Sequence, residues 1–316
     1  MSNHLGEVSI LLAAVFWSIA VVIFRSVGNT ISAFVVTPAK NFIAIILFGM
    51  ACIFTGAPIW YEGLSDLEYY KLIISGCLGM GIADLLFLYS LNKIGASRIA
   101  ILNTLEPFSV LLLSYLMLGG DNQIPNGIQL IGFIIISTAV LSIALEKSPR
   151  KDVDSKSYYQ GIILMISAIL ISSFGIVLMK PVLSHLFELG KAQDSQYNSY
   201  QLLLWGSMLR LFPGVLITIF ILLSKKNWRE LLKPVINKDV RLKLLLASGL
   251  GTFFALNFWI MGYASMDKTA LTSILGQTSA IFIIILARIF LKETITPLRA
   301  MSMCIAFFGV VLVVSG

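Results

Sequence analysis

A few ionisable side chains fall inside long apolar stretches of the sequence, chiefly Lys40, Asp84, Glu106 and Arg210. A charge placed in hydrocarbon costs at least about 3 kcal/mol, so each of these groups should face a partner or a polar cavity. The two acids are candidates for carrying protons, and the two bases for binding an anionic group such as a carboxylate. A buried ion pair that only fixes helix packing is the alternative. The mid-helix depth of Arg210 favours ligand binding, whereas Lys40 favours pairing.

Glu106 has the most informative neighbourhood, in the segment ILNTLEPFSVLL at residues 101–112. Pro107 lacks a backbone N–H and clashes with the preceding turn, which predicts a distorted helix with exposed carbonyl groups. Asn103 adds a polar side chain one turn earlier. A carboxyl beside such a break could exchange a proton with a cavity. Alternatively, it could form hydrogen bonds across helices that stabilise the break.

The elements that must position these groups are predicted to be membrane-spanning helices. Hydrophobic residues make up 58% of the 316 residues and charged residues 12%, whereas soluble domains are about half apolar and a quarter charged. Helices of about 20 apolar residues span a bilayer core of ~30 Å. We expect an all-α membrane protein with ten transmembrane helices, at residues 6–27, 34–55, 70–91, 97–118, 127–145, 159–180, 200–223, 243–264, 270–290 and 297–315.

The remaining chain forms short connectors, the longest near 146–158, 181–199 and 224–242. Lysines and arginines concentrate in alternate connectors, and the opposite face has only Lys71, Lys180, Lys191 and Lys268. By the positive-inside rule the basic face is cytoplasmic, which predicts that both termini lie outside. The first helix begins without a basic cluster or a cleavage site, so we expect it to be retained.

The ten spans divide into two halves of five, predicted at residues 1–150 and 151–316. Displacing the first half by 172 positions brings Lys71 onto Lys243, Asp121 onto Glu293 and Pro125 onto Pro297. Because five is odd, such halves cross the membrane in opposite directions. Inverted five-helix repeats are typical of secondary transporters, whose substrate site lies between the repeats. We interpret Asp121 and Glu293 as turn or capping groups.

In the second half, the uncharged segment Gln277–Thr278–Ser279 takes the place of Leu105–Glu106–Pro107. Asn257 and Tyr263 lie on the preceding predicted helix, and Trp17 lies on the first. Such residues suit hydrogen bonding and stacking against a small amphipathic solute. The predicted substrate-binding set is therefore Arg210, Lys40, Asn103, Gln277, Asn257, Trp17 and Tyr263, with Glu106 and Asp84 as the proton-coupling candidates.

Several other kinds of site are not supported by the sequence. The three cysteines fall in separate apolar spans and the two histidines are far apart, so no metal site or disulfide framework is expected. The glycines of GCLGMGIAD, at residues 76–84, lack the order and context of a nucleotide fingerprint and suit close helix packing. No ATP-binding loop is present, so we expect no cofactor. The net charge of +7 comes from topology signals and does not indicate a nucleic-acid partner.

Two segments carry a family resemblance. LEPFSVLLLSYLMLGGD at residues 105–121 resembles the lePvfaxllaxlxlgE stretch of the EamA family, in the drug/metabolite transporter (DMT) superfamily. IFLKETITPLRAMSMCIAFFGVVLVV at residues 289–314 resembles that family's closing helix pair. SAILISSFGIVLMK at residues 167–180 is similar to the first helix of small multidrug transporters, but Ser172 and Ser173 lie in the region of their proton-binding glutamate.

The resemblance implies a non-enzymatic secondary transporter of a small organic metabolite in the cytoplasmic (inner) membrane of a bacterium, exporting amino acids or related metabolites. Its expected partners are the solute and membrane lipid, and it would act as a monomer or homodimer. Proton exchange and facilitated efflux both remain open as the driving mechanism. The alternatives are an exchanger or importer of a sugar or nucleotide-linked solute, with Lys40 and Arg210 on phosphate, an integral-membrane enzyme, or a scaffold.

Overall fold

The computed structural model describes residues 4–119, 126–144 and 155–315, and those residues form helices joined by short connectors. In the first half the helices are α1 (Leu5–Val27), α2 (Ala33–Thr55), α3 (Asp66–Ser75), η1 (Gly76–Ala83), α4 (Asp84–Ile94), α5 (Ala96–Asn103), α6 (Glu106–Leu118) and α7 (Gly127–Ala144). In the second half they are α8 (Ser155–Leu189), α9 (Ser199–Leu223), α10 (Trp228–Leu232), η3 (Lys233–Ile236), α11 (Lys238–Ala247), η4 (Ser248–Ala255), α12 (Leu256–Ser265), α13 (Thr269–Gly276), α14 (Thr278–Phe290) and α15 (Pro297–Ser315).

The expected membrane-spanning character is confirmed for most of the chain. Eight helical stretches among the described residues are long and apolar enough to cross a membrane: Leu5–Val27, Ala33–Thr55, Asp66–Ile94, Ala96–Leu118, Lys156–Leu189, Ser199–Leu223, Lys238–Ser265 and Thr269–Phe290. Each begins and ends close to a predicted span. The other two predicted spans are also helical, as α7 and α15, and the apolar part of α15 is the shorter Pro297–Gly309.

Two predicted connectors proved to be partly helical. The chain stays helical through Pro181 to Leu189, because the residues beyond the proline are buried against neighbouring helices; Val182 and Leu183 have no exposed surface. The 224–242 connector holds α10 and η3 and includes the start of α11. The predicted boundary between residues 150 and 151 lies outside the described residues, as does Asp121.

The sequence did not predict the two π-helical segments. In η1 and η4, each eight residues long, the helix is wound more loosely inside a membrane-spanning stretch. The bounds of η1 displaced by 172 give those of η4, and α6 relates to α14 by the same displacement. Short π-helical segments are rare and often accompany functional sites. Their matched positions support the repeat register read from the sequence.

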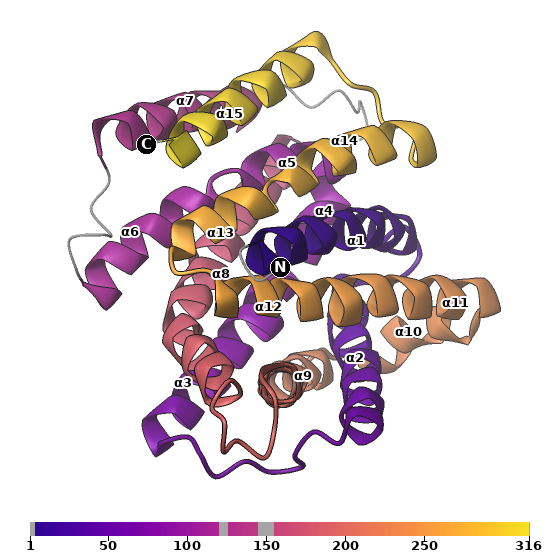
Figure 1. Cartoon of the computed structure of the whole chain (residues 1–316). Helices are drawn as coiled ribbons and strands as arrows, with labels where there is room; N and C mark the ends of the chain where they lie inside the picture. The colour runs from indigo at the N-terminus through magenta and orange to yellow at the C-terminus, as the bar shows by residue number, and fades with distance from the viewer. Residues whose placement is uncertain (1–3, 120–125, 145–154, 316) are drawn as a thin grey trace.

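The helices form a core of membrane-length elements with one helix pair set to one side. In Figure 1, α7 and α15 lie against each other at the top, next to α14, whereas α1 lies within the bundle between α14 and the line of η4 and α12. Packing of α1 is extensive against α12, α14 and η4, all from the second half. The first helix of one half is therefore enclosed by the other half.

The helix α9 packs closely on η1 because both carry glycines at their contact. A Cβ at Gly76 would come 2.1 Å from the backbone oxygen of Arg210, and one at Gly214 would come 3.0 Å from the Cβ of Met80. This geometry supports the packing interpretation of the glycine-rich segment.

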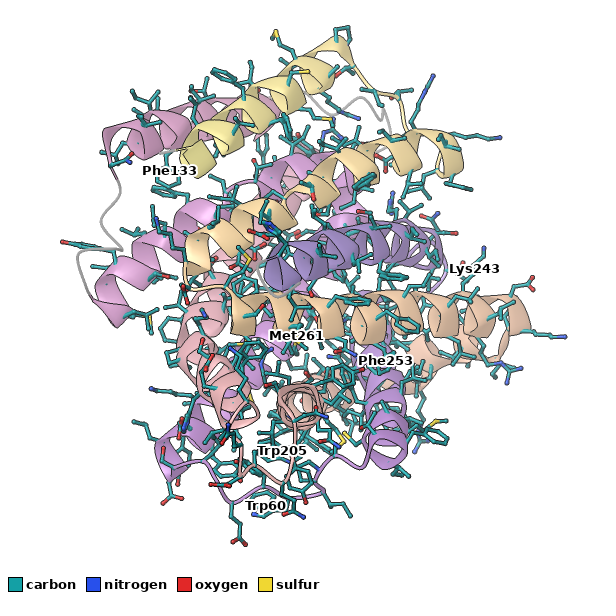
Figure 2. The ribbon with its side chains drawn as sticks, in the orientation of Figure 1. Trp60, Phe133, Trp205, Lys243, Phe253 and Met261 are labelled. Carbon is teal, nitrogen blue, oxygen red and sulfur yellow. The ribbon has the colours of Figure 1, made fainter. Side chains whose placement is uncertain are left out.

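At one end of the bundle, aromatic side chains hold the α2–α3 connector against α9. Trp60 stacks on Tyr69 with ring centroids 5.1 Å apart, and both pack edge-on against Trp205. Trp60 and Trp205 lie together at the bottom of Figure 2. Phe253 of η4, also labelled there, packs on Phe48 of α2 at 4.8 Å.

Candidate functional site

A cavity of about 190 Å³ lies between the two halves. Its walls come from α1, α2, η1, α4, α5 and α6 of the first half and from α8, α9, η4, α12, α13 and α14 of the second. We call it the central cavity. It is smaller than the ~300–1,000 Å³ of pockets that hold drug-sized ligands, so it suits a small solute. Both π-helical segments contribute to its wall, through Gly79, Met80 and Ala83 on one side and Gly251, Thr252 and Ala255 on the other.

Eight of the nine predicted site residues line the central cavity, namely Trp17, Lys40, Asp84, Asn103, Glu106, Arg210, Tyr263 and Gln277. Asn257 does not line it. Its side-chain amide instead donates a hydrogen bond to the hydroxyl of Tyr200 on α9, at 3.1 Å. Asn257 lies only two residues before the cavity-lining Trp259, and that offset turns its side chain to a different face of α12.

Lys40 and Asp84 form a buried ion pair. Lys40 Nζ lies 2.5 Å from Asp84 Oδ2 and also donates to Asn41 Oδ1 at 2.8 Å. Both side chains are largely excluded from solvent, with 2% and 17% of their surface exposed. Asn41 in turn donates to the backbone oxygen of Met80 in η1 at 2.6 Å. The pair therefore joins α2 to the η1–α4 helix, as expected for the packing alternative.

Arg210 is just as deeply buried but lacks an ion pair within the described residues. It is 2% exposed, and its Nε donates to Ser75 Oγ at 2.9 Å. One of its terminal nitrogens is buried without a hydrogen-bond partner. Asp84 attracts the guanidinium, although its carboxylate is held by Lys40. A buried cation with an unused donor beside a cavity is suited to binding an anionic group.

Glu106 sits where the fourth membrane-spanning stretch is broken. The helix α5 ends at Asn103 and α6 begins at Glu106, with Pro107 in its first turn. Asn103 Nδ2 donates to Glu106 Oε2 at 3.1 Å, and Gln277 Nε2 approaches the same oxygen at 3.5 Å. Asn103 also donates to Gln277 Oε1 at 3.4 Å. Glu106 is therefore hydrogen-bonded to residues from both halves.

Aromatic rings cover part of the remaining wall. Trp259 packs against Tyr263 with ring centroids 4.3 Å apart, and Trp17 packs against Phe87 at 5.5 Å. All four residues line the central cavity. The cavity thus combines separate charged groups with flat apolar surfaces, a composition suited to a small organic molecule with a polar head.

The family comparison agrees with this arrangement. The model of the EamA-like transporter family matches residues 4–145 and again residues 159–315. The chain belongs to the EamA-like transporter family. The two matches cover nearly the whole chain as two repeats of one family unit, and the central cavity lies between elements of both.

Structural comparison agrees on the fold. A solved crystal structure of a protein matches with a TM-score of 0.63 over 97% of this chain and 95% of that chain, at 12% sequence identity. That likeness concerns the fold alone. A search among curated proteins finds no match to the sequence.

Two polar residues that organise the site of this EamA-like chain were missed in the sequence. Ser75 contacts Arg210, and Asn41 joins Lys40 to η1. Asn41 directly follows Lys40 in an apolar span, which could have marked it as a partner. Ser75 looks like an ordinary small residue before the glycine-rich segment, and only the packing of α9 on η1 reveals its role.

Proposed function

We propose that the chain is a secondary transporter that moves a small organic metabolite across the cytoplasmic membrane of a bacterium by alternating access, with amino acids or related metabolites exported. The observation that carries the proposal is the central cavity, which is small, contains buried charges and is lined by both repeats of an EamA-like chain. Alternating access requires a site between two units that can rock against each other.

The architecture that we propose has ten transmembrane helices, adding α7 and α15 to the eight apolar stretches, in two repeats of opposite orientation. It is supported by the displacement of 172 residues that relates η1 to η4 and α6 to α14. Both termini would lie outside. A reporter fused to the C-terminus tests this orientation, and cytoplasmic activity of the reporter would contradict it.

We propose that Arg210 binds the carboxylate of the solute. Of the two basic residues in the cavity, Lys40 is already neutralised by Asp84 at 2.5 Å, whereas Arg210 has only one neutral hydrogen bond to Ser75. The amides of Asn103 and Gln277, with the rings of Trp17 and Tyr263, would then contact the rest of the solute. Lys40 would act indirectly, by holding Asp84 and η1 in place.

We propose that Glu106, rather than Asp84, carries the coupling proton. A proton carrier must be free to lose and regain its charge, and the contact with Lys40 favours the ionised form of Asp84. The hydrogen-bond partners of Glu106 are neutral amides, one from each repeat. Protonation of Glu106 would weaken these contacts with the amide N–H groups and so connect the proton to the movement of the repeats.

The experiment is solute uptake and counterflow in proteoliposomes, against a panel of amino acids, purines, sugars and sugar phosphates, with and without a pH gradient. We expect flux of carboxylate-bearing solutes, its loss in Arg210→Gln, and loss of pH-gradient dependence in Glu106→Gln. Preference for phosphorylated solutes would favour an exchanger. Absence of flux for the whole panel would contradict the transport proposal, and unchanged coupling in Glu106→Gln would refute its proton role.

A further inference from the structure

Glu293, in the connector between α14 and α15, binds the start of a helix in the other half. Its Oε1 accepts from the backbone N–H of Ala96 at 2.9 Å. Its Oε2 accepts from the backbone N–H of Ser97 at 3.0 Å and from the Ser97 hydroxyl at 2.7 Å. The capping role expected for Glu293 is thus present, but the helix that it caps is α5 of the first half.

The contact is closely fitted. Gly95, just before α5, has φ +89°, and a Cβ added there would lie 2.9 Å from Glu293 Oε1. The carboxylate also faces the positive end of the α5 dipole. Burial raises the pKa of Glu293, but the hydrogen bonds from Ser97 and Ala96 and the charge of Arg25 outweigh it, so the pKa lies below its ordinary 4.5. The group is ionised at neutral pH.

The equivalent place in the second half differs. Thr269 opens α13 as Ser97 opens α5, 172 positions earlier. Its hydroxyl is buried and, within the described residues, has no hydrogen-bond partner. A basic contact is present at both places: Lys180 donates to the backbone oxygen of Met266 at 2.7 Å, and Arg25 to that of Asn92 at 3.1 Å. The described structure therefore shows the acidic cap at α5 alone.

The position of α5 connects this contact to the central cavity. The helix is eight residues long, about 12 Å at 1.5 Å per residue, and its last residue is the cavity-lining Asn103. Asn103 holds Glu106. Displacement of the start of α5 would therefore move the groups that line the cavity.

We infer that Glu293 is a latch between the two repeats: it holds the α4–α5 junction against the second half in this conformation, and it must release when the repeats move apart at that face. The inference rests on the proposed transport function for its purpose. It needs no knowledge of the solute, because the latch can be tested through access to the cavity alone.

The test uses Ser172→Cys, a cavity-lining reporter, in a background where Cys52, Cys77 and Cys304 are replaced by serine. A membrane-impermeant maleimide is applied to each side of oriented proteoliposomes in turn, and the labelling rates are measured. Glu293→Gln removes the charge, and Glu230→Gln on exposed α10 is the matched control. We expect Glu293→Gln to raise labelling from the Glu293 side roughly tenfold and to lower it from the other side, because hydrogen bonds to a charged group are stronger than neutral ones.

The reciprocal change separates a latch from a general loosening, which would raise labelling from both sides. Ser97→Ala, which keeps both backbone hydrogen bonds, should give the same pattern at roughly threefold, and it stands in if Glu293→Gln does not fold. Equal labelling of the Glu293 and Glu230 variants, or a rise from both sides, would overturn the latch. A reciprocal shift with no flux of any solute would leave the latch in place and count against the transport proposal.

Discussion

The α5–α6 break and the α13–α14 break share a backbone but not a chemistry. Thr104, which ends α5, has φ −63° and ψ −10°, and Gln277, which ends α13, has φ −70° and ψ −9°. The first break is followed by Glu106 and Pro107, and the second by Thr278 and Ser279. The break therefore needs neither the proline nor the carboxylate. Glu106 has a role beyond holding the helix break, which supports its proposed part in coupling.

The two buried cations differ in a similar way. Lys40 on α2 pairs with Asp84, whereas the position equivalent to Asp84 in the second half, 172 residues later, is Leu256. Arg210 on α9 thus has no acid in its own half to match the one that Lys40 uses. The first half satisfies its cation internally, and the second half leaves a donor unused. Similar repeats have built an asymmetric cavity, which would hold a solute in one orientation.

Breaking the first-half pair should have the largest effect on stability. Lys40→Met and Asp84→Asn each leave a buried group without its partner, and we expect each to lower the free energy of unfolding by about 3–5 kcal/mol. Denaturation in detergent, followed by circular dichroism, measures the loss. The double variant Lys40→Met/Asp84→Leu should recover most of it. Single variants as stable as the parent chain would show that the pair is not structural.

Arg210→Gln should give the opposite result, with little loss of stability and a large loss of transport. The substitution removes a buried charge that has one neutral hydrogen bond, so we expect a change of no more than about 1 kcal/mol in unfolding. Losing a charged contact with the solute carboxylate, worth about 1.5–3 kcal/mol, should lower the apparent affinity roughly 10- to 150-fold. Uptake titrations measure it.

Arg210→Lys is the matched control for that variant. It keeps the charge but not the paired donors, so its affinity should fall between the parent chain and Arg210→Gln. If Arg210→Gln unfolds as readily as Lys40→Met, or transports carboxylates normally, the contrast between the two cations is wrong.

Much of this contrast could be predicted from the sequence, because placing charges in hydrocarbon is costly enough to mark them. Apolar length placed the helices, and the rarity of ionisable residues pointed to Lys40, Asp84, Glu106 and Arg210. Local sequence could not show that η1 and η4 are π-helical, since their glycines and small residues are also compatible with an α-helix. It also could not say which cation Asp84 would choose, because that depends on the approach of α2 to α4. Asn257 was misplaced for the same reason.

Moving the carboxylate between the two breaks should test whether coupling depends on its position. Glu106→Gln keeps an amide near Asn103 and Gln277, so counterflow should persist while uptake driven by a pH gradient is lost. In Glu106→Gln/Thr278→Glu the acid lies on the first turn of α14, and partial return of pH-gradient dependence is expected. Thr278→Glu alone is the control for added charge. Full gradient-driven uptake by Glu106→Gln would show that its carboxyl is not the carrier.

Exchanging the proline between the breaks should have the smallest effect. Pro107 occupies the first turn of α6, where a missing N–H costs no helical hydrogen bond, so Pro107→Ala should change the free energy of unfolding by less than about 1 kcal/mol. Ser279→Pro places a proline at the matching position of α14 and keeps the Ser279 backbone oxygen, which accepts from Ser18 at 3.1 Å. Both variants should transport at near-parental rates. A large loss in Pro107→Ala alone would mean that the first break depends on its proline, and that the backbone match with Gln277 conceals a difference in rigidity.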